Sequence, residues 1–404
     1  MSLTFASDDG WIISHLKYID KIYSSINNGS ESCSLKFNDV FFDINTKYLR
    51  HNQNPEIDDR DAVPVSDNSS IKTKKRKKGT KAFPCADLEQ VKKTRKRQSG
   101  ILSSATELGC FVGDKRNDNN KAARLVSEKF YAESHRNKVE NLHGSNKTER
   151  AVISETRYER YVFPERCSFY CYDVRNIEDK IQMNNQFDFI LLDPPWWNKS
   201  IRRKKSKCSE ASYKMMYNEE LAKIPVGKLL SSNGIVAVWC TNAPSHLRSI
   251  SEEMFPAWGV KYQAKWYWVK VTNSGETVCD FNPPPGKQPY ELLLLGSVSS
   301  NPSIDIPDGK LVVSVPSAVH SHKPPLTGII IFIIFETTFS ELIRSYLPSD
   351  PNCLELFARY LLPGWTSWGL EVLKFQHLSL YSIIEDSSIL TSSRTDTPLP
   401  VPRL

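Results

Sequence analysis

Uninterrupted apolar runs that alternate with helix-like segments are the feature of this 404-residue sequence that most restricts its fold. The helix-like segments include Asn218–Leu230 and Pro244–Met254. Strands that are apolar on both faces must be covered on both faces, as in a largely parallel sheet packed between helices. We therefore expect an α/β domain with a mostly parallel central sheet over residues 158–377, with its chemistry at the carboxyl ends of the strands. The apolar runs are Phe187–Leu192 (FDFILL), Gly234–Cys240, Tyr262–Val271, Tyr290–Gly296, Lys310–Val315, Cys353–Phe357 and Trp365–Gly369.

The rest of the chain divides into segments with weaker patterns. Residues 9–27 place apolar side chains at helical spacing, which predicts a short helix within an N-terminal segment, 1–49. Residues 50–116 are polar, charged and Ser-rich, so we expect a mostly disordered basic linker. A polar helical pattern predicts a connector at 117–157, and a Ser/Thr/Pro-rich composition predicts a disordered tail at 378–404.

The net charge of +7 is concentrated in one stretch of the chain. Twelve Lys or Arg residues lie between positions 72 and 97, in the clusters Lys72–Lys78 and Lys92–Arg97, against two acidic residues. Such blocks are typical of a nuclear address or of an arm that binds nucleic acid, although a solvated linker without a partner has the same composition. We expect a nuclear protein, with the cytoplasm as a second location.

Several classes of protein are disfavoured by what the sequence lacks. The longest apolar run, Gly328–Phe335, is much shorter than the ~20 residues of a membrane-spanning helix, so we expect no membrane span. Met1–Gly10 has neither the basic start nor the apolar stretch of a secretory signal. The nine cysteines show no C-x-x-C spacing, and His320 and His322 have no second cluster beside them, so we expect a soluble intracellular protein without disulfides or a metal site.

The strand Phe187–Leu192 runs directly into Asp193, Pro194, Pro195 and Trp196. Each proline fixes φ and removes a backbone donor, so the carbonyls there are available as acceptors. A carboxylate and a carbonyl that accept the two N–H bonds of an exocyclic base amine would direct its lone pair, otherwise delocalised into the ring, at an electrophilic methyl group. An aromatic ring that stacks on the base would add about 1–3 kcal/mol. Catalysis would then rest on positioning and electrostatics. A proline-rich turn in which Asp193 caps a helix is the structural alternative.

Four blocks in order carry a resemblance to a known family: FDFILLDPPWWNKS at 187–200, WVKVTNSGE at 268–276, KLVVSVPSAVHSHKPPL at 310–326 and LELFARYLLPGWTSWG at 354–369. The chain resembles the DPPW-type adenine N6-methyltransferases, the family that includes the messenger-RNA N6-adenosine writer, over residues 158–377. This resemblance implies a permuted class I, Rossmann-like methyltransferase domain in which the DPPW strand precedes the strand that binds the cofactor S-adenosylmethionine. It also implies that Asp193 to Trp196 form the catalytic face.

The resemblance further implies four cofactor contacts. Asp173 would lie near the adenine end of S-adenosylmethionine, and Lys323 would contact its methionine carboxylate in a charge-assisted bond. Glu355 and Arg359 would face the ribose. The domain lacks a G-x-G-x-x-G loop, which a sulfonium cofactor without phosphates does not need. An ordinary set of surface ion pairs is the alternative for Lys323, Glu355 and Arg359.

A second basic cluster directly follows the catalytic turn. In a nucleic-acid enzyme such a loop would contact phosphates beside the target base and close over it, whereas an exposed loop kept soluble by lysines is the alternative. Asn273 and Glu291 are weaker candidates for the same pocket. The cluster consists of Arg202, Arg203, Lys204, Lys205 and Lys207.

Three departures from the family pattern bear on activity. The segment Thr327–Ser340 (TGIIIFIIFETTFS) is an insertion that the family would not contain, and it falls just after Lys323. Leu370 stands where the family usually has Asn in the cofactor pocket, and the sequence after His377 differs from the usual ending.

Three functions remain open from the sequence. The resemblance implies N6-methylation of adenosine in RNA, with a 2′-O-methylated adenosine of small nuclear RNA as the substrate class. Adenine in DNA is the first alternative, because the DPPW turn contacts the amine and not the sugar. A catalytically inactive scaffold that binds nucleic acid, inactivated by the insertion, is the second.

Overall fold

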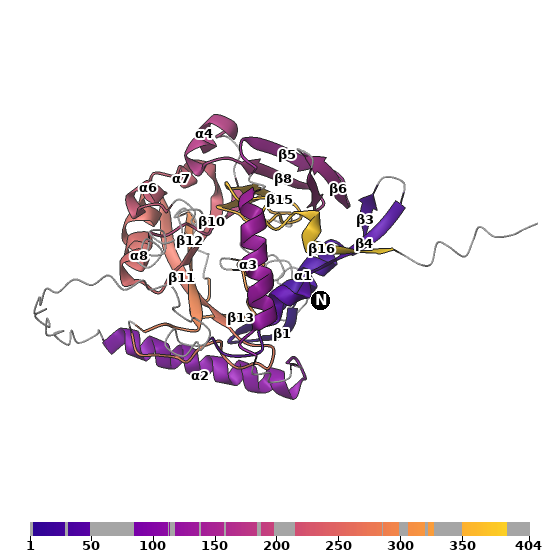
Figure 1. Ribbon diagram of the computed structural model, residues 1–404. Coiled ribbons are helices and arrows are strands. Elements are labelled where there is room, and N and C mark those ends of the chain that lie inside the picture. The colour runs from indigo at the N-terminus through magenta and orange to yellow at the C-terminus, as the bar shows by residue number, and fades with distance from the viewer. Residues whose placement is uncertain are drawn as a thin grey trace, which may run out of the picture.

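The computed structural model describes residues 3–28, 31–48, 85–111, 113, 118–136, 139–156, 159–183, 187–197, 215–284, 286–298, 306–319, 322–326 and 350–385. These residues form an 11-stranded sheet and a five-stranded sheet, with helices around them (Figure 1). The strands of the large sheet are β1 (Leu3–Ser7), β2 (Gly10–Ile13), β5 (Leu142–Asn146), β8 (Cys167–Cys171), β9 (Phe187–Leu192), β10 (Leu230–Cys240), β11 (Val260–Lys270), β12 (Tyr290–Val298), β13 (Leu311–Ser314), β14 (Cys353–Leu356) and β15 (Trp365–Trp368). Their order across the sheet is β1-β2-β13-β11-β12-β10-β9-β14-β15-β8-β5.

Strand β9 lies near the middle of this sheet, between β10 and β14, and is parallel to both. At its carboxyl end Leu192 pairs with Val238 of β10 and with Leu356 of β14. Strands β14, β15 and β8 continue in parallel, whereas β12 runs antiparallel between β10 and β11. The mostly parallel sheet expected from the sequence is confirmed, and β9 precedes its neighbour β14 in the chain, as a permuted class I methyltransferase fold requires.

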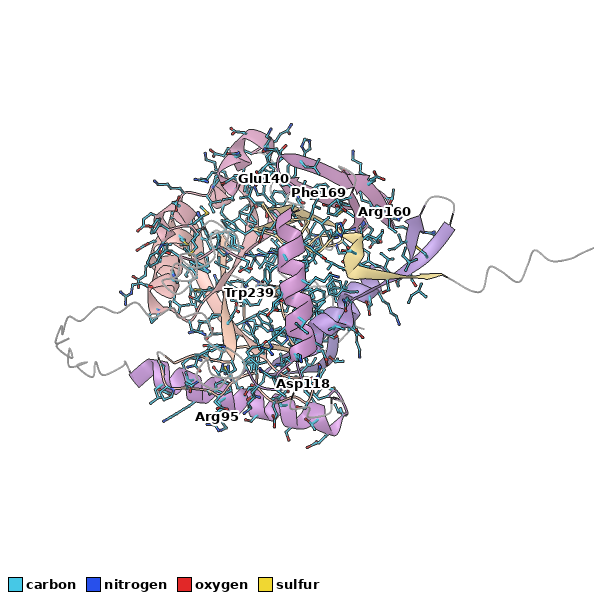
Figure 2. All side chains as sticks on the ribbon, in the orientation of Figure 1. Arg95, Asp118, Glu140, Arg160, Phe169 and Trp239 are labelled. Carbon is cyan, nitrogen blue, oxygen red and sulfur yellow. The ribbon has the colours of Figure 1, made fainter. Side chains whose placement is uncertain are left out.

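The apolar runs are buried on both faces of the sheet, which explains why they show no alternation. Ile190 and Leu192 of β9 belong to one hydrophobic cluster, whereas Phe189 and Leu191 belong to another on the opposite face. Trp239 of β10, labelled at the centre of Figure 2, is buried in the second cluster. Because successive side chains of a strand point to opposite faces, a strand that is covered on both sides must be apolar throughout.

Helices cover the two faces and supply most of the remaining core. The first cluster includes residues of α2, α4, α6 and α7, and the second includes residues of α1 and α3. Pro225 separates α6 from α7 within the stretch predicted as one helix, because proline lacks the N–H that would continue it. No helix in the described ranges is long and apolar enough to cross a membrane. The helices are α1 (His15–Ile22), α2 (Cys85–Glu107), α3 (Lys121–Arg136), α4 (Ile177–Lys180), α6 (Asn218–Ala222), α7 (Val226–Leu229), α8 (Pro244–Ser249) and α9 (Phe255–Ala257), with the π-helix η5 (Ile250–Met254) and the 3₁₀ helices η1 (Asp39–Phe42), η3 (Val174–Asn176) and η6 (Leu378–Leu380).

The N-terminal segment is part of the large sheet, and the single helix predicted over 9–27 is only partly correct. Trp11 and Ile12 lie on β2, which pairs with β13, and the helix begins at His15. Gly10 permits this pairing, because a Cβ at this position would lie 1.9 Å from the carbonyl oxygen of Leu311 and its φ is +149°. A strand, a complete short helix and the start of a further strand gave the appearance of one helical period over 9–27.

The expectation of disorder over 50–116 is wrong for residues 85–107, which form α2 at the edge of the molecule (Figure 1). Ile101 and Ala105, one turn apart, are buried in the first cluster. A helix needs only a few apolar side chains to pack on strands that lie far away in the chain. Local composition therefore predicted disorder for a segment that is helical.

The tail is also ordered at its start, where η6 and β16 (Tyr381–Glu385) follow His377. Strand β16 pairs with β4 in the five-stranded sheet, so the prediction of a disordered tail is wrong for 378–385. This sheet has the order β16-β4-β3-β6-β7, with β3 (Ile26–Asn28), β4 (Glu31–Phe37), β6 (Ala151–Thr156) and β7 (Glu159–Phe163).

Candidate functional site

The turn after β9 is held by backbone hydrogen bonds to neighbouring segments. The Asp193 N–H donates to the carbonyl of Leu356 at the end of β14 (3.3 Å). The carbonyl of Pro194 accepts from the Trp196 N–H (2.9 Å), and the carbonyl of Pro195 accepts from the Met216 N–H (3.0 Å). The sequence had suggested that the two proline carbonyls are free, whereas each of them accepts a backbone hydrogen bond. Each oxygen still keeps a second acceptor position.

The Asp193 carboxylate is buried between two cations that come from distant parts of the chain. Its side chain is 8% exposed; Oδ1 lies 2.9 Å from Lys323 Nζ, and Oδ2 lies 2.5 Å from Arg359 Nη1. Lys323 follows β13, and Arg359 follows β14. The structure thus brings together a predicted catalytic residue and two predicted cofactor contacts, at the carboxyl ends of β9 and β14 and on the segment that follows β13.

These contacts belong to a longer chain of alternating charges. Glu291 accepts from both Lys323 (3.3 Å) and Lys270, and Glu371 accepts from both Arg359 (3.3 Å) and Lys374 (2.9 Å). We name the seven residues from Lys270 to Lys374 the ion chain. Lys270, Glu371 and Lys374 were not predicted from the sequence, and their positions at or just after the ends of β11 and β15 are the signal that could have found them. The members of the ion chain, in order of contact, are Lys270, Glu291, Lys323, Asp193, Arg359, Glu371 and Lys374.

Glu355 lies beside the ion chain as an eighth titratable group. It is buried on β14, and its Oε2 has no hydrogen-bond partner in the described part of the chain. Burial and the nearby negative charge of Asp193 raise the pKa of Glu355 to about 8, against the opposing effect of Arg359 and Lys323. Glu355 is therefore largely protonated at neutral pH.

Lys323 and Glu371 of the ion chain keep their charges despite their burial. Burial lowers the pKa of Lys323, but Asp193 and Glu291 outweigh this effect and the pKa is raised overall. For Glu371 burial acts to raise the pKa, and the attraction of Lys374 and Arg359 lowers it overall. Opposite charges at hydrogen-bond distance thus hold Lys323 and Glu371 in their ionised forms.

An open pocket with about 620 Å³ of empty space lies next to the turn. Arg359 lines it and bonds to Asp193, whereas Asp193, Lys323 and Glu355 are not among its lining residues. This volume includes open solvent, because the pocket is open to the surface. Its lining residues are Tyr172, Asp173, Val174, Arg175, Pro195, Met216, Glu220, Phe357, Ala358, Arg359, Gly369, Leu370 and Glu371.

Asp173 and Leu370 mark two sides of this pocket. The Asp173 carboxylate caps η3 by accepting from the Arg175 N–H (3.0 Å), and it also pairs with the Arg175 guanidinium (2.5 Å). Leu370 follows β15 and is 36% exposed. An apolar side chain therefore occupies the position where the resemblance had implied an amide.

Trp196 is a structural residue of the turn in this arrangement. Its indole N–H donates to the Trp239 carbonyl (2.9 Å), its ring packs against His246 with centroids 4.8 Å apart, and it is buried in the core. The exposed aromatic surface beside the turn comes from Tyr217, whose ring stacks on Trp197 with centroids 6.0 Å apart. The prediction that Trp196 offers its face to a base therefore has no support in its position.

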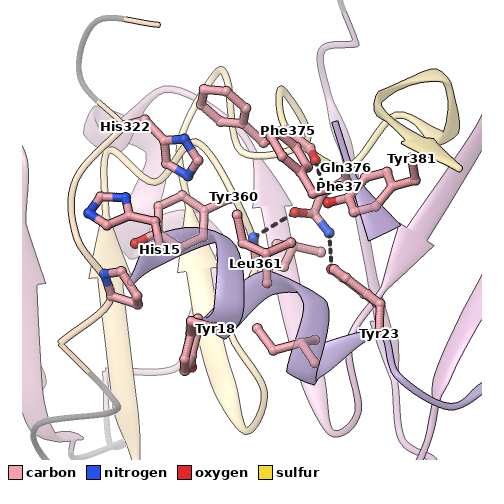
Figure 3. A pocket seen from close by; sticks show the side chains of 13 residues that line it. His15, Tyr18, Tyr23, Phe37, His322, Tyr360, Leu361, Phe375, Gln376 and Tyr381 are labelled. Atoms are coloured by element: carbon pink, nitrogen blue, oxygen red, sulfur yellow. Dashed lines mark hydrogen bonds between the residues drawn. The ribbon is translucent and has the colours of Figure 1, made fainter. Parts of the chain in front are cut away.

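A second pocket lies under α1, among side chains from α1, β4 and the segments around Tyr360 and Phe375 (Figure 3). His15 and His322 face each other there with ring centroids 5.7 Å apart. Burial, with the positive charges of Arg359 and Lys323, lowers the pKa of His322 to about 3, so the imidazole is neutral. Across the described ranges, no group of three or more His, Cys, Asp or Glu side chains could hold a metal ion.

Several predicted features lie outside the described residues. These are the basic cluster at 202–207, the insertion Thr327–Ser340 and the charged cluster Lys72–Lys78. The cluster Lys92–Arg97, by contrast, lies on α2.

Comparisons with known proteins match the region of the chain that holds this site. Residues 187–371 match the MT-A70 family. The chain is 40% identical over 240 residues to human N(6)-adenine-specific methyltransferase METTL4, covering 57% of this chain and 47% of that protein. It is 37% identical over 192 residues to the N6-methyladenosine RNA methyltransferase MTA1 of Cryphonectria parasitica, covering 47% of this chain and 53% of that protein. It is 32% identical over 234 residues to a DNA N6-methyl methyltransferase of Caenorhabditis elegans, covering 56% of this chain and 58% of that protein.

The chain spans about half the length of the curated relatives that it matches. The matched region contains the DPPW turn, both strands beside β9 and most of the ion chain. Residues 187–371 are thus similar to the MT-A70 family, and the mostly parallel sheet around β9 agrees with the class I S-adenosylmethionine-dependent methyltransferase fold expected from the sequence.

Proposed function

We propose that this protein transfers a methyl group from S-adenosylmethionine to the N6 amine of adenine in a nucleic acid. The observation that carries the proposal is the position of Asp193. It lies at the carboxyl end of β9, fixed by Lys323 and Arg359, and Arg359 also lines the adjoining open pocket. In parallel α/β sheets, ligands bind at this edge.

The residues of the pocket fit the cofactor. Tyr172, Phe357 and Leu370 give it an apolar lining for an adenine ring, and Asp173 provides a carboxylate that can accept from an amine or hydroxyl. The cation of Arg359 and the neighbouring Lys323 suit the carboxylate of the cofactor. When bound, S-adenosylmethionine supplies an electrophilic methyl group on a sulfonium centre.

Asp193 would orient the amine without leaving its cations. Each carboxylate oxygen accepts one bond from Lys323 or Arg359 and has a further lone pair for an N–H donor. A fixed carboxylate that accepts an amine N–H draws the nitrogen lone pair out of conjugation with the ring. The ion chain keeps this acceptor in place before the substrate arrives, which is the electrostatic preorganisation that catalysis of this kind needs.

RNA is the substrate class that we propose, with 2′-O-methylated adenosine of small nuclear RNA as the finer assignment. The resemblance of the motifs and the likeness to an N6-methyladenosine RNA methyltransferase support RNA, and the resemblance alone supports the finer assignment. The likeness to a DNA N6-methyl methyltransferase supports DNA as the alternative. In either case the base must leave its stack, which costs least in a single strand. We further propose that the protein works in the nucleus, on the evidence of Lys72–Lys78.

A scaffold without catalysis is the second candidate, because Thr327–Ser340 follows the Lys323 segment and Leu370 replaces an amide on the rim of the pocket. Calorimetry with S-adenosylmethionine separates the two candidates. Heat of binding that saturates at one cofactor per chain supports the enzyme, whereas folded protein that gives no heat supports the scaffold.

The catalytic assignment is tested by transfer of labelled methyl to matched oligonucleotides of RNA, DNA and 2′-O-methylated RNA, each with a single adenosine. We expect Asp193→Asn to abolish transfer. Asp188→Asn, at the opposite end of the same strand, is the matched control and should retain it. Full activity of the Asp193 variant would show that the chemistry has been assigned to the wrong residue.

A further inference from the structure

The outward face of α2 carries exposed cations, and its inward face is packed on the protein. Lys92, Lys93, Arg95 and Lys96 are exposed. We propose that this face, here called the α2 basic face and defined by these four residues, binds the phosphate backbone of the nucleic-acid substrate. The proposal rests on the proposed function, since it names a second contact surface for the same substrate.

The spacing of buried residues shows that α2 has one defined outer face. Val91, Thr94, Gln98, Ile101 and Ala105 recur every three or four positions and are buried. The four cations fall between and opposite these positions, so they project to solvent from an ordered helix; Figure 2 labels Arg95 there.

The helix is anchored at its middle, and the chain is anchored again just beyond its carboxyl end. Arg97 donates to the Gly309 carbonyl (2.7 Å) and pairs with Asp9 (3.6 Å), which fixes the basic half. Beyond its carboxyl end, the Gly113 N–H donates to the Asn273 carbonyl (3.2 Å), in the loop that follows β11. Lys270, the last residue of β11, begins the ion chain. Contacts at Arg97 and Gly113 therefore hold α2 against the part of the protein that also carries Lys270.

The chemistry of this face favours phosphates over other partners. Between Lys92 and Gly100 the exposed positions hold only charged residues, Ser99 and glycine, and Leu88 is the single exposed large apolar residue among the described side chains of α2, so this face lacks the broad apolar centre of a protein interface. A helix that binds a membrane surface must expose its apolar stripe, and here Ile101 and Ala105 are buried. Exposed cations in a row suffice for phosphates, because release of counterions supplies the binding free energy.

The test is a salt titration of binding by the full-length protein, with a fluorescein-labelled 30-nucleotide single-stranded RNA followed by fluorescence anisotropy. The variant is K92Q/K93Q/R95Q/K96Q, because glutamine keeps the helix propensity and removes the charge. The matched control, K121Q/R124Q/K129Q/K228Q, removes the same number of exposed charges from α3 and α7. Each lost phosphate contact reduces the slope of log K against log salt by about 0.7.

For the α2 variant we expect a slope that is shallower by about 2–3, and binding at least about 10-fold weaker at 0.1 M salt. The control variant should stay close to the wild type. Equal losses in both variants, or none in the α2 variant, would overturn the proposal, as would wild-type protein that binds anionic phosphatidylserine vesicles and not RNA. The anisotropy assay contains no S-adenosylmethionine, so its result does not depend on methyl transfer. Failure of the proposed methyl transfer would show instead in the calorimetry with the cofactor and in the transfer assay on the wild type.

Discussion

Replacing Glu355 by Gln should remove a specific pH dependence of stability. The carboxyl of Glu355 has a folded-state pKa of about 8, against an ordinary value of 4.5. Between these two values the folded protein holds a proton that the unfolded chain has lost. Stability therefore falls as pH rises through this window, by about 1.4 kcal/mol per pH unit and about 5 kcal/mol in all. The amide of the variant cannot ionise, so it escapes this loss.

The measurement is urea unfolding without cofactor at pH 6, 7, 8 and 9. From pH 6 to 9 we expect the wild type to lose about 3 kcal/mol more than Glu355→Gln, since only the part of the window below pH 8 is sampled. Other titrating groups are common to both proteins and cancel in the difference. Glu178→Gln, which alters an exposed carboxylate on α4, should run parallel to the wild type. Parallel curves for Glu355→Gln and the wild type would refute the burial and charge argument.

Three further changes test other parts of the structure. Asp193→Ala leaves Lys323 and Arg359 with one acidic partner each, so we expect a loss of about 3 kcal/mol in urea unfolding, and an unchanged midpoint would contradict the ion chain. His322→Phe removes an imidazole whose pKa is lowered to about 3. Between pH 6.5 and 5 the free energy of unfolding of the wild type should fall by about 2 kcal/mol on this account, because the unfolded state takes up the proton, and that of the variant should fall by less. Equal losses in both proteins would show that the ring is already charged in the folded state. Gly369→Ala places a Cβ 2.7 Å from a backbone carbonyl of the loop after β14, so cofactor affinity measured by calorimetry should fall by about tenfold or more, whereas wild-type affinity would show that the pocket rim yields freely.

The sequence predicted the central sheet because each strand is apolar throughout, and this property does not depend on knowing the neighbours. It predicted Asp193, Lys323 and Arg359 through motifs, and the structure joins all three directly. It did not predict which cation neutralises which acid, since Asp193 and Lys323 are 130 positions apart and only the strand order brings them together. Trp196 shows the same limit, because a motif gives the residue but not the direction of its ring.

Helix α2 and strand β2 were misjudged for a related reason. Helix α2 has few apolar residues and strand β2 has only four residues in all, and both are stabilised by surfaces that belong to the later part of the chain. Propensity and local composition describe a segment in isolation, whereas tertiary contacts supply most of the stability of a polar helix.

The docking of β2 on β13 decides how the protein can be divided for laboratory work. A truncated protein that starts near residue 158 would contain every motif of the methyltransferase resemblance, yet it would leave the backbone edge of β13 unpaired and uncover Trp266, which packs on Trp11 with ring centroids 5.2 Å apart. An unpaired strand edge beside an exposed indole ring favours hydrogen bonding between strands of different molecules. Preparations that begin at residue 158 should therefore precipitate or self-associate, and those that retain residues 3–13 should remain dispersed.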